Sequence, residues 1–368
     1  MRLVKFSKAN AIWRILDAQA ATSGGWGSLF LVGSKLLLRS GPIIFWRKAA
    51  RLFGIVHRSP DMLVVAPVFS NNLDRNSSCK IGLDTWFGMI KESYLSPPVL
   101  FRNVNLPSFP SDLIQSNTTG QCGLPTISEA FVFYRDCVST FSELGCAIQE
   151  ENRVLDFGVG WGRISRFFLR DVPLENIYGI DVTSEYIDIC KKTFDSSNFG
   201  ACQPFPPSAF PSDYFNFIVA YSVFSHLSEE ACMQWIKEFS RILAPGGMVA
   251  ITTRGRPFFD YCESQRINSN SLVGAKRTTP YMSALGRLFD DFDIARVRYD
   301  NGEFVHSNAR GVTGGGAMDG SFYGETFIPE EYARTAYSSF LDFERFIFDP
   351  RYQSHPIIFL RKRLSDSL

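Results

Sequence analysis

The sequence predicts an α/β protein in which a doubly wound parallel sheet follows a helical N-terminal region. From residue 152 onward, short apolar runs alternate with amphipathic stretches, as in parallel strands joined by helices. Two strand-like runs near the end of the chain have only a short link between them, which predicts an antiparallel hairpin. With 368 residues, of which 45% are hydrophobic, the chain can bury a large core, and this composition excludes intrinsic disorder.

The expected elements follow one another in a regular order. The first strand is expected at Val154–Phe157, where an apolar run ends in a glycine-rich turn. Pro245-Gly246-Gly247 is expected to end a helix that begins after Ser228, a typical helix-capping residue. Further strands are expected at 177–182, 215–221 and 248–253, helices at 86–93, 124–144, 164–169, 186–194 and 229–243, and the terminal hairpin at 343–348 and 357–360.

Changes in composition divide the chain into three segments. Residues 1–60 are expected to form a basic amphipathic helical extension, and residues 61–150 a connecting region of helices and loops. Residues 151–368 form the main domain, with an insertion on the substrate side at about 256–340.

Charge is unevenly divided along the chain. Residues 1–60 carry ten Lys or Arg and one acid, whereas residues 61–368 carry 28 basic and 36 acidic residues. After Pro42, apolar side chains recur at helical spacing with arginines on the other side, so this extension can rest on an anionic membrane or dock on the rest of the protein. Because the main domain has no basic surface with interleaved aromatic residues, no nucleic acid is expected as a partner.

Cysteine and histidine usage indicates a reducing compartment and no bound metal. The eight cysteines form no Cys-x-x-Cys pair, and no ligand-like spacing links the four histidines to each other or to a cysteine. No signal peptide is expected, and the longest uncharged run, 18–34, is too short and too polar to span a bilayer. We therefore expect a cytoplasmic protein, with peripheral contact to the inner face of the membrane through residues 1–60 as an open alternative.

The most informative stretch follows the first strand. Gly158, Gly160 and Gly162 let the backbone turn sharply and approach a ligand with no Cβ in the way. Asp181 ends the second strand, where a carboxylate can accept two hydrogen bonds from ribose hydroxyls. A carboxylate at Asp156 would repel a pyrophosphate but suits a ligand that carries an ammonium group. The glycine spacing also differs from the Gly-x-Gly-x-x-Gly of nicotinamide dinucleotide sites.

These residues resemble class I S-adenosylmethionine-dependent methyltransferases. Their first motif is similar to Asp156-x-Gly158-x-Gly160-x-Gly162, and their acidic ribose ligand corresponds to Asp181. The resemblance continues through 215–227 and 235–247, with Asn216 where many members have Asp. It implies a Rossmann-like seven-stranded sheet with a C-terminal antiparallel hairpin, and S-adenosyl-L-methionine as the cofactor. Residues 96–102 also look like the lead-in of bacterial members associated with polysaccharide biosynthesis.

The resemblance implies a role for each part of the loop. The loop backbone would hold the methionine part of the cofactor, Asp156 would orient its ammonium, Asp181 would bind the ribose, and Val182 would lie against the adenine. Trp161 could cover the cofactor or pack against a helix, and Arg163 could pair with the cofactor carboxylate or form a surface salt bridge. The expected cofactor-binding residues are Asp156, Gly158, Val159, Gly160, Trp161, Gly162, Asp181, Val182 and Tyr221.

Three residues are candidates for catalysis. His226 follows the third strand by about one turn and is the first candidate for a general base, because imidazole has an unperturbed pKa near neutrality. A structural histidine that bonds the loop backbone is the alternative. Tyr221 at the strand end and His306 in the insertion are further candidates. The glycine-dense loop 311–324 could close over a substrate or simply connect surface elements.

The expected reaction is transfer of a methyl group to a hydroxyl of a saccharide or another small molecule. N-methylation of a small metabolite is also open. One rival is a cofactor-binding scaffold without catalysis, recruited to a membrane through residues 1–60. A nicotinamide-dependent oxidoreductase would share the sheet, but the glycine spacing and Asp156 argue against it.

Overall fold

The computed structural model describes residues 81–102, 104–270, 279–309, 311–314, 316 and 318–364. Contacts within the chain divide it into two units, Met1–Ser77 and Ser78–Leu368, and the described residues belong to the second. The basic extension expected at 1–60, with its membrane contact, lies outside the described residues. Across the described ranges, no helix combines the length and the apolar character needed to cross a bilayer.

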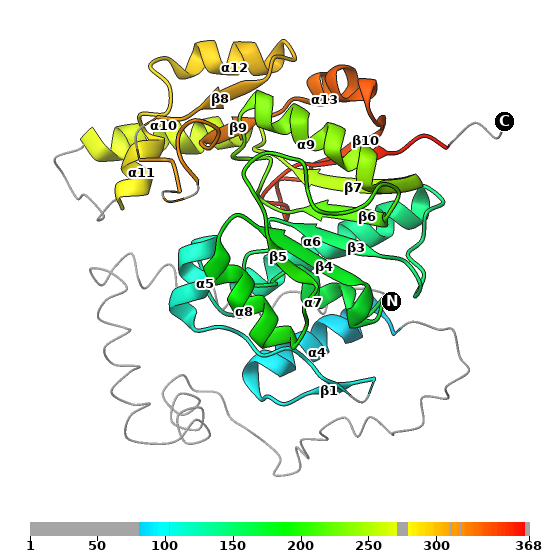
Figure 1. Ribbon diagram of the computed structural model, residues 1–368. Coiled ribbons are helices and arrows are strands. Elements are labelled where there is room, and N and C mark those ends of the chain that lie inside the picture. The colour runs from blue at the N-terminus through cyan, green and yellow to red at the C-terminus, as the bar shows by residue number, and fades with distance from the viewer. Residues whose placement is uncertain are drawn as a thin grey trace, which may run out of the picture. The chain divides into compact units, whose positions relative to one another are not determined.

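A seven-stranded sheet lies at the centre of this unit, in the order β10-β11-β7-β6-β3-β4-β5 (Figure 1). The strands from β7 to β5 are parallel, and β11 runs antiparallel to both β7 and β10. The predicted doubly wound sheet with a terminal antiparallel hairpin is therefore confirmed. The bounds are β3 Val154–Phe157, β4 Ile177–Asp181, β5 Phe199–Ala201, β6 Phe215–Ala220, β7 Leu243–Thr252, β10 Asp342–Ile347 and β11 Ile357–Arg361.

Helices cover both faces of the sheet, which is why its central strands are almost wholly apolar. Along β6, Ile218 and Ala220 face one helical layer, whereas Phe217 and Val219 face the other. The first layer contains α9 (Glu229–Ile242), α13 (Glu330–Ala336) and the 3-10 turn η2 (Tyr337–Ser339). The second contains α4 (Leu83–Leu95), α6 (Leu124–Glu143) and α7 (Ser165–Phe168), with α8 (Ser184–Phe194) packed on β4 and β5.

Three short segments lie outside the sheet and the helical layers described above. β1 (Leu100–Phe101) and β2 (Val104–Asn105) pair as a small hairpin, and α5 (Asp112–Thr119) lies near the turn that follows β3. The 3-10 turn η1 (Leu174–Asn176) leads into β4. At α9, the hydroxyl of Ser228 accepts the Ala231 N–H, so the predicted cap is confirmed.

The insertion between β7 and β10 has a small core of its own. Phe259 and Phe327 stack there with ring centroids 3.9 Å apart, surrounded by Leu285, Phe292 and Val305. This packing gives the described elements of the insertion a shared apolar core. Its elements are α10 Pro257–Asn270, α11 Pro280–Leu285, α12 Phe292–Asp300, β8 Val305–Ser307 and β9 Glu325–Phe327.

The short pairs β1–β2 and β8–β9 were not predicted, and within the seven-stranded sheet the structure differs from the sequence prediction most at two strands. β5 was not predicted, because its three residues, Phe199–Ala201, have a glycine at their centre and are too short for a hydrophobic period. β7 begins at Leu243 and not at Met248, because Leu243 pairs with Phe215 directly after α9 ends. Pro245-Gly246-Gly247 therefore lies inside the strand range, although the helix does end before it, as predicted.

Replacing Phe327 by Ala is expected to destabilise the protein by about 3–5 kcal/mol, because the change removes a fully buried ring and leaves a cavity. Urea unfolding followed by tryptophan fluorescence measures this change. Ile294→Ala in the same insertion is the matched control, because Ile294 is 61% exposed, and its effect is expected to stay within about 0.5 kcal/mol. Equal effects of the two substitutions would contradict the assigned core.

Candidate functional site

The glycine turn between β3 and α7 takes a shape that side chains would prevent. Gly158, Gly160 and Gly162 have φ values of +72°, +52° and +79°, in the left-handed region that favours glycine. A Cβ on Gly158 would lie 2.3 Å from Cγ2 of Val223, and a Cβ on Gly162 would lie 2.3 Å from Cε2 of Phe194. The glycines therefore bring the backbone of this turn into close contact with the loop after β6 and with α8.

Asp181 ties this turn to the end of β4. Its Oδ2 accepts a hydrogen bond from the Gly160 N–H at 2.9 Å, and its Oδ1 accepts one from the Thr183 N–H at 2.8 Å. Burial raises the pKa of the Asp181 carboxyl. The Thr183 hydroxyl and the Val182 N–H also donate to this carboxylate, so protein donors hold it at the end of β4. Val182 follows directly, at the start of the loop to α8.

Asp156 lies at the other side of the same turn and is nearly fully buried. Its Oδ2 accepts hydrogen bonds from the Ser165 N–H at 3.0 Å and from the Ser165 hydroxyl at 2.7 Å. Burial raises its pKa to about 6, because no cation contacts the carboxylate closely enough to offset desolvation. Within the described residues, its Oδ1 accepts no hydrogen bond. The carboxylate is therefore able to bind a cationic group such as an ammonium.

The structure places the side chains of Trp161 and Arg163 inside the protein. The Trp161 ring is fully buried, 6.1 Å from the ring of Phe109 and 5.0 Å from the guanidinium of Arg166. Among the described residues, its indole Nε1 has no hydrogen-bond partner. Arg163 forms a buried ion pair with Glu129 at 2.8 Å, and so it does not form the surface salt bridge considered from sequence.

His226 lies at the same edge of the sheet, in the loop between β6 and α9. Its Nδ1 is 2.8 Å from the carbonyl oxygen of Gly324, and its ring stacks on Tyr323 with centroids 4.9 Å apart. Because a carbonyl only accepts, Nδ1 carries the hydrogen and the neutral ring has its lone pair on Nε2. Nε2 makes no hydrogen bond to the described residues. Burial lowers the pKa of His226, which favours this neutral form.

His306 is held in the same tautomer by a weaker partner. Its Nδ1 lies 2.7 Å from Oγ1 of Thr326, and the Thr326 hydroxyl donates to the Leu227 carbonyl at 2.6 Å. The hydroxyl must then accept from Nδ1. Burial lowers the pKa of His306 to about 4, so its imidazole is a poor proton acceptor near neutral pH.

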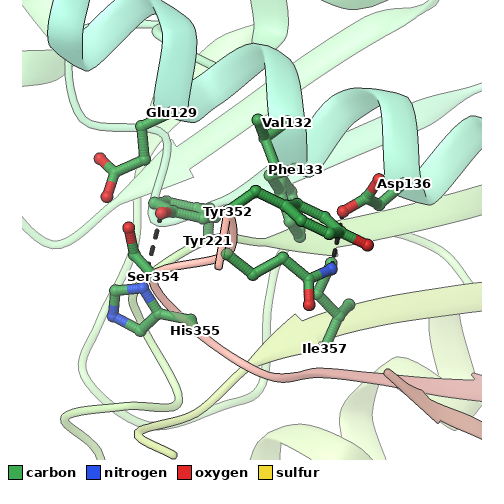
Figure 2. Close-up of a pocket in the computed structure, with 10 residues that line it drawn as sticks. Glu129, Val132, Phe133, Asp136, Tyr221, Tyr352, Ser354, His355 and Ile357 are labelled. Carbon is green, nitrogen blue, oxygen red and sulfur yellow. Dashed lines mark hydrogen bonds between the residues drawn. The ribbon is translucent and has the colours of Figure 1, made fainter. Parts of the chain in front are cut away.

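Tyr221 lies on the α6 side of β6, beside a small pocket (Figure 2). Its hydroxyl is 3.5 Å from Nδ1 of His355 and also hydrogen-bonds with Glu129 and Ser354. The guanidinium of Arg163 lies 4.8 Å from the centre of its ring. Burial raises the pKa of the Tyr221 phenol, so the phenol remains protonated. The pocket is lined by Glu129, Val132, Phe133, Asp136, Tyr221, Tyr352, Gln353, Ser354, His355 and Ile357.

The fold thus gathers most of the predicted site residues at one sheet edge. Asp156, Asp181 and the glycines lie together around the turn after β3, and Tyr221 and His226 follow the adjacent β6. Sequence reasoning gave no role to Glu325, Glu129 or His355, which come from β9, from α6 and from the segment before β11. No motif marks these three residues. Among the described residues, no cluster of three His, Cys, Asp or Glu could hold a metal ion.

Comparison with known proteins assigns this part of the chain. Residues 154–247 match a family described as a methyltransferase domain. An uncharacterized methyltransferase of Oceanobacillus iheyensis is 33% identical over 101 residues, which span 27% of this chain and 45% of that relative. The chain therefore covers less than half the length of this curated relative. Over residues 154–247, the chain is therefore similar to a methyltransferase domain.

Two solved structures are also similar to part of this chain. An S-adenosylmethionine-dependent methyltransferase from Methanosarcina mazei is 18% identical, with 61% of this chain and 98% of that chain covered and a TM-score of 0.38. One from Clostridium acetobutylicum is 10% identical, with 68% of this chain and 96% of that chain covered and a TM-score of 0.41.

Asp156→Asn is expected to change stability in a pH-dependent way. The pKa of about 6 in the folded protein lies above the ordinary aspartate value of 3.8, so wild-type stability falls as pH rises through this window. The uncharged amide of Asn has no charge to desolvate, and its oxygen can still accept a hydrogen bond from the Ser165 N–H. The stability of the variant relative to wild type should therefore rise by about 2–4 kcal/mol between pH 4 and pH 7. Urea unfolding at both pH values measures the difference, and a difference independent of pH would refute the assigned desolvation.

Proposed function

We propose that the protein transfers the methyl group of S-adenosylmethionine to a hydroxyl of a small, uncharged acceptor, with His226 as general base. One observation supports this proposal above the others. His226 is held with Nε2 available as a proton acceptor, at the same sheet edge as the glycine turn and Asp181. Ligands of open α/β sheets bind at this edge.

The residues around the turn fit the cofactor. The close approach at Gly158 and Gly162 leaves backbone where Cβ atoms would clash, and this backbone would hold the methionine part. Asp156 would accept from its ammonium, Asp181 would accept from the ribose hydroxyls, and Val182 would contact the adenine. When bound, the cofactor supplies a sulfonium methyl group that is already activated for displacement.

His226 would remove the acceptor proton as the new bond forms. The acceptor O–H would donate to Nε2, and the acceptor oxygen would take the methyl group that bound S-adenosylmethionine would supply, with S-adenosylhomocysteine as the other product. The proton ends on Nε2, so the imidazole becomes an imidazolium. His306 is the weaker candidate base, because its pKa of about 4 makes it a poorer proton acceptor. Tyr221, protonated and hydrogen-bonded to Glu129, would orient groups near the reacting atoms.

The acceptor class follows from the sequence resemblance of residues 96–102 to members associated with polysaccharide biosynthesis. A sugar hydroxyl is uncharged at neutral pH and needs a base, which agrees with a buried, neutral His226. We therefore propose a saccharide acceptor and a cytoplasmic reaction. N-methylation of a small metabolite and a cofactor-binding scaffold without transfer are the alternatives that the following experiments separate.

Asp181→Asn is expected to weaken S-adenosylhomocysteine binding about 10-fold or more, because an amide replaces a charged acceptor for the ribose hydroxyls. Isothermal titration calorimetry measures this change, with NAD titrated in parallel and expected not to bind. Asp188→Asn on the exposed side of α8 is the control and should bind like wild type. Equal affinity of the Asp181 and Asp188 variants would remove Asp181 from the cofactor site.

His226→Gln is expected to lower kcat about 100- to 10,000-fold, the range typical of a lost general base, while leaving S-adenosylhomocysteine affinity unchanged. The measurement is S-adenosylhomocysteine release with a panel of neutral sugars and small amines. His306→Gln should cost much less. If wild type binds the cofactor but transfers to no member of the panel, the scaffold alternative takes the place of the proposed reaction.

A further inference from the structure

An ion pair between the fully buried Glu325 and the partly buried Arg254 lies directly behind His226. Oε2 of Glu325 accepts a hydrogen bond from Nε of Arg254 at 2.7 Å, and Oε1 accepts one from the Tyr281 hydroxyl at 2.5 Å. Burial alone would raise the pKa of Glu325, but the adjacent Arg254 outweighs it and holds the pKa below its usual value. The carboxylate is therefore charged at neutral pH although it is fully buried.

The same carboxylate faces the imidazole. Oε1 of Glu325 lies 3.4 Å from Nδ1 of His226, the nitrogen whose hydrogen is donated to the Gly324 carbonyl. A negative charge at this distance stabilises an imidazolium more than a neutral imidazole. His306, in contrast, has the Thr326 hydroxyl and no carboxylate at its Nδ1 among the described residues, although Glu325 also raises the pKa of His306. Of the two candidate bases, only His226 has a carboxylate beside Nδ1.

Arg254 is itself held in place on two sides. Its Nη1 lies 2.8 Å from Nε2 of His355, and its guanidinium lies 4.1 Å from the ring centre of Phe258. Because arginine only donates, Nε2 of His355 must accept, and the hydrogen of His355 is on Nδ1, facing the Tyr221 hydroxyl. Burial, together with the charge of Arg254, keeps the pKa of His355 well below its usual value. His355 therefore remains a neutral acceptor for Arg254.

We propose that Glu325 is a positioning residue for His226, fixed by Arg254, and that it stabilises the imidazolium formed when His226 takes the acceptor proton. This inference rests on the proposed function, because it assigns Glu325 a part in the same proton transfer. It explains why the chain buries a charged pair in the insertion, where two apolar side chains of similar size would pack without any desolvation penalty.

A purely structural pair would have a different consequence. It would join β9 to the end of β7, and its loss would lower stability without changing the basicity of His226. The charged and titratable groups that face His226 are Glu325 and Arg254 of this pair, Tyr323 stacked on its ring, and His306 and His355 nearby. Glu325 raises the pKa of His226 and Arg254 lowers it, Glu325 acting more strongly. The titration of His226 therefore distinguishes the two interpretations.

The test is an NMR titration of the full-length protein with ring-labelled histidine, comparing wild type with Glu325→Gln. We expect the Nδ1–H tautomer of His226 in wild type and a pKa lower by about one unit or more in the variant. Glu238→Gln is the matched control, because it removes another buried carboxylate, paired with Arg241 at 2.6 Å, and should leave His226 unchanged. An unchanged pKa in folded Glu325→Gln would overturn the proposal.

Leaving Arg254 buried without its partner could prevent folding, so a double variant provides a second test. Arg254→Gln with Glu325→Gln removes both charges together, which avoids an unpaired buried cation. The pKa of His226 should still fall, by less than in the single variant, because the stronger of the two influences is that of Glu325. An unchanged or raised pKa in the double variant would overturn the proposal.

Kinetics connect the inference to the reaction. With an acceptor from the sugar panel, Glu325→Gln should lower kcat about 10- to 100-fold with KM nearly unchanged, and should move the acid limb of the pH profile to lower pH. If His226 proves essential for transfer but its pKa does not move, the proposed function stands and this inference fails. If the pKa of His226 moves as expected but wild type transfers no methyl group, the proposed function fails, and Glu325 has no part in a methyl transfer.

Discussion

The parallel pairing of β3 with both β4 and β6 is the constraint on which the site depends. In this register Asp156 lies opposite Gly179 on one side and Val219 on the other, so the chain leaves all three strands at one edge. The glycine turn, the Asp181 carboxylate and the loop that carries His226 follow those strand ends. A one-residue shift in this strand register would turn the polar side chains toward the opposite helical layer and separate the proposed base from the glycine turn.

The buried carboxylates at this edge show that the group beside a carboxylate, and not burial alone, determines whether its pKa is raised or lowered. Burial raises the pKa of Asp156 to about 6, because Ser165 supplies only dipoles. Glu325 is equally buried, yet Arg254 lowers its pKa. The Asp156 carboxylate can therefore still bind a cationic ligand. Glu325 has its oxygens occupied by protein donors and can act only through the imidazole beside it.

The sequence predicts the parts of the site that are local in the chain. The glycine turn and Asp181 follow strands that their own apolar runs predict, and His226 follows β6 within one turn. Glu325 and His355 could not be predicted, because their function depends on contacts with Arg254, 71 and 101 residues away, and no spacing records such contacts. The two sequence interpretations of His226 are also compatible, since Nδ1 bonds the loop backbone and Nε2 remains free for a proton.

The insertion determines the orientation of the proposed base, although the sheet determines its place. Gly324 donates its N–H to the His226 carbonyl at 2.8 Å and accepts the His226 Nδ1–H at its own carbonyl, so backbone and ring are fixed by one residue. A Cβ on Gly324 would lie 2.2 Å from the Ser307 carbonyl oxygen. Any larger residue at this position would therefore move the Gly324 carbonyl away from the His226 ring. In the proposed reaction, the sheet edge would thus provide the cofactor side of the site, and the insertion, through Gly324 and Glu325, would control the basicity of His226 on the acceptor side.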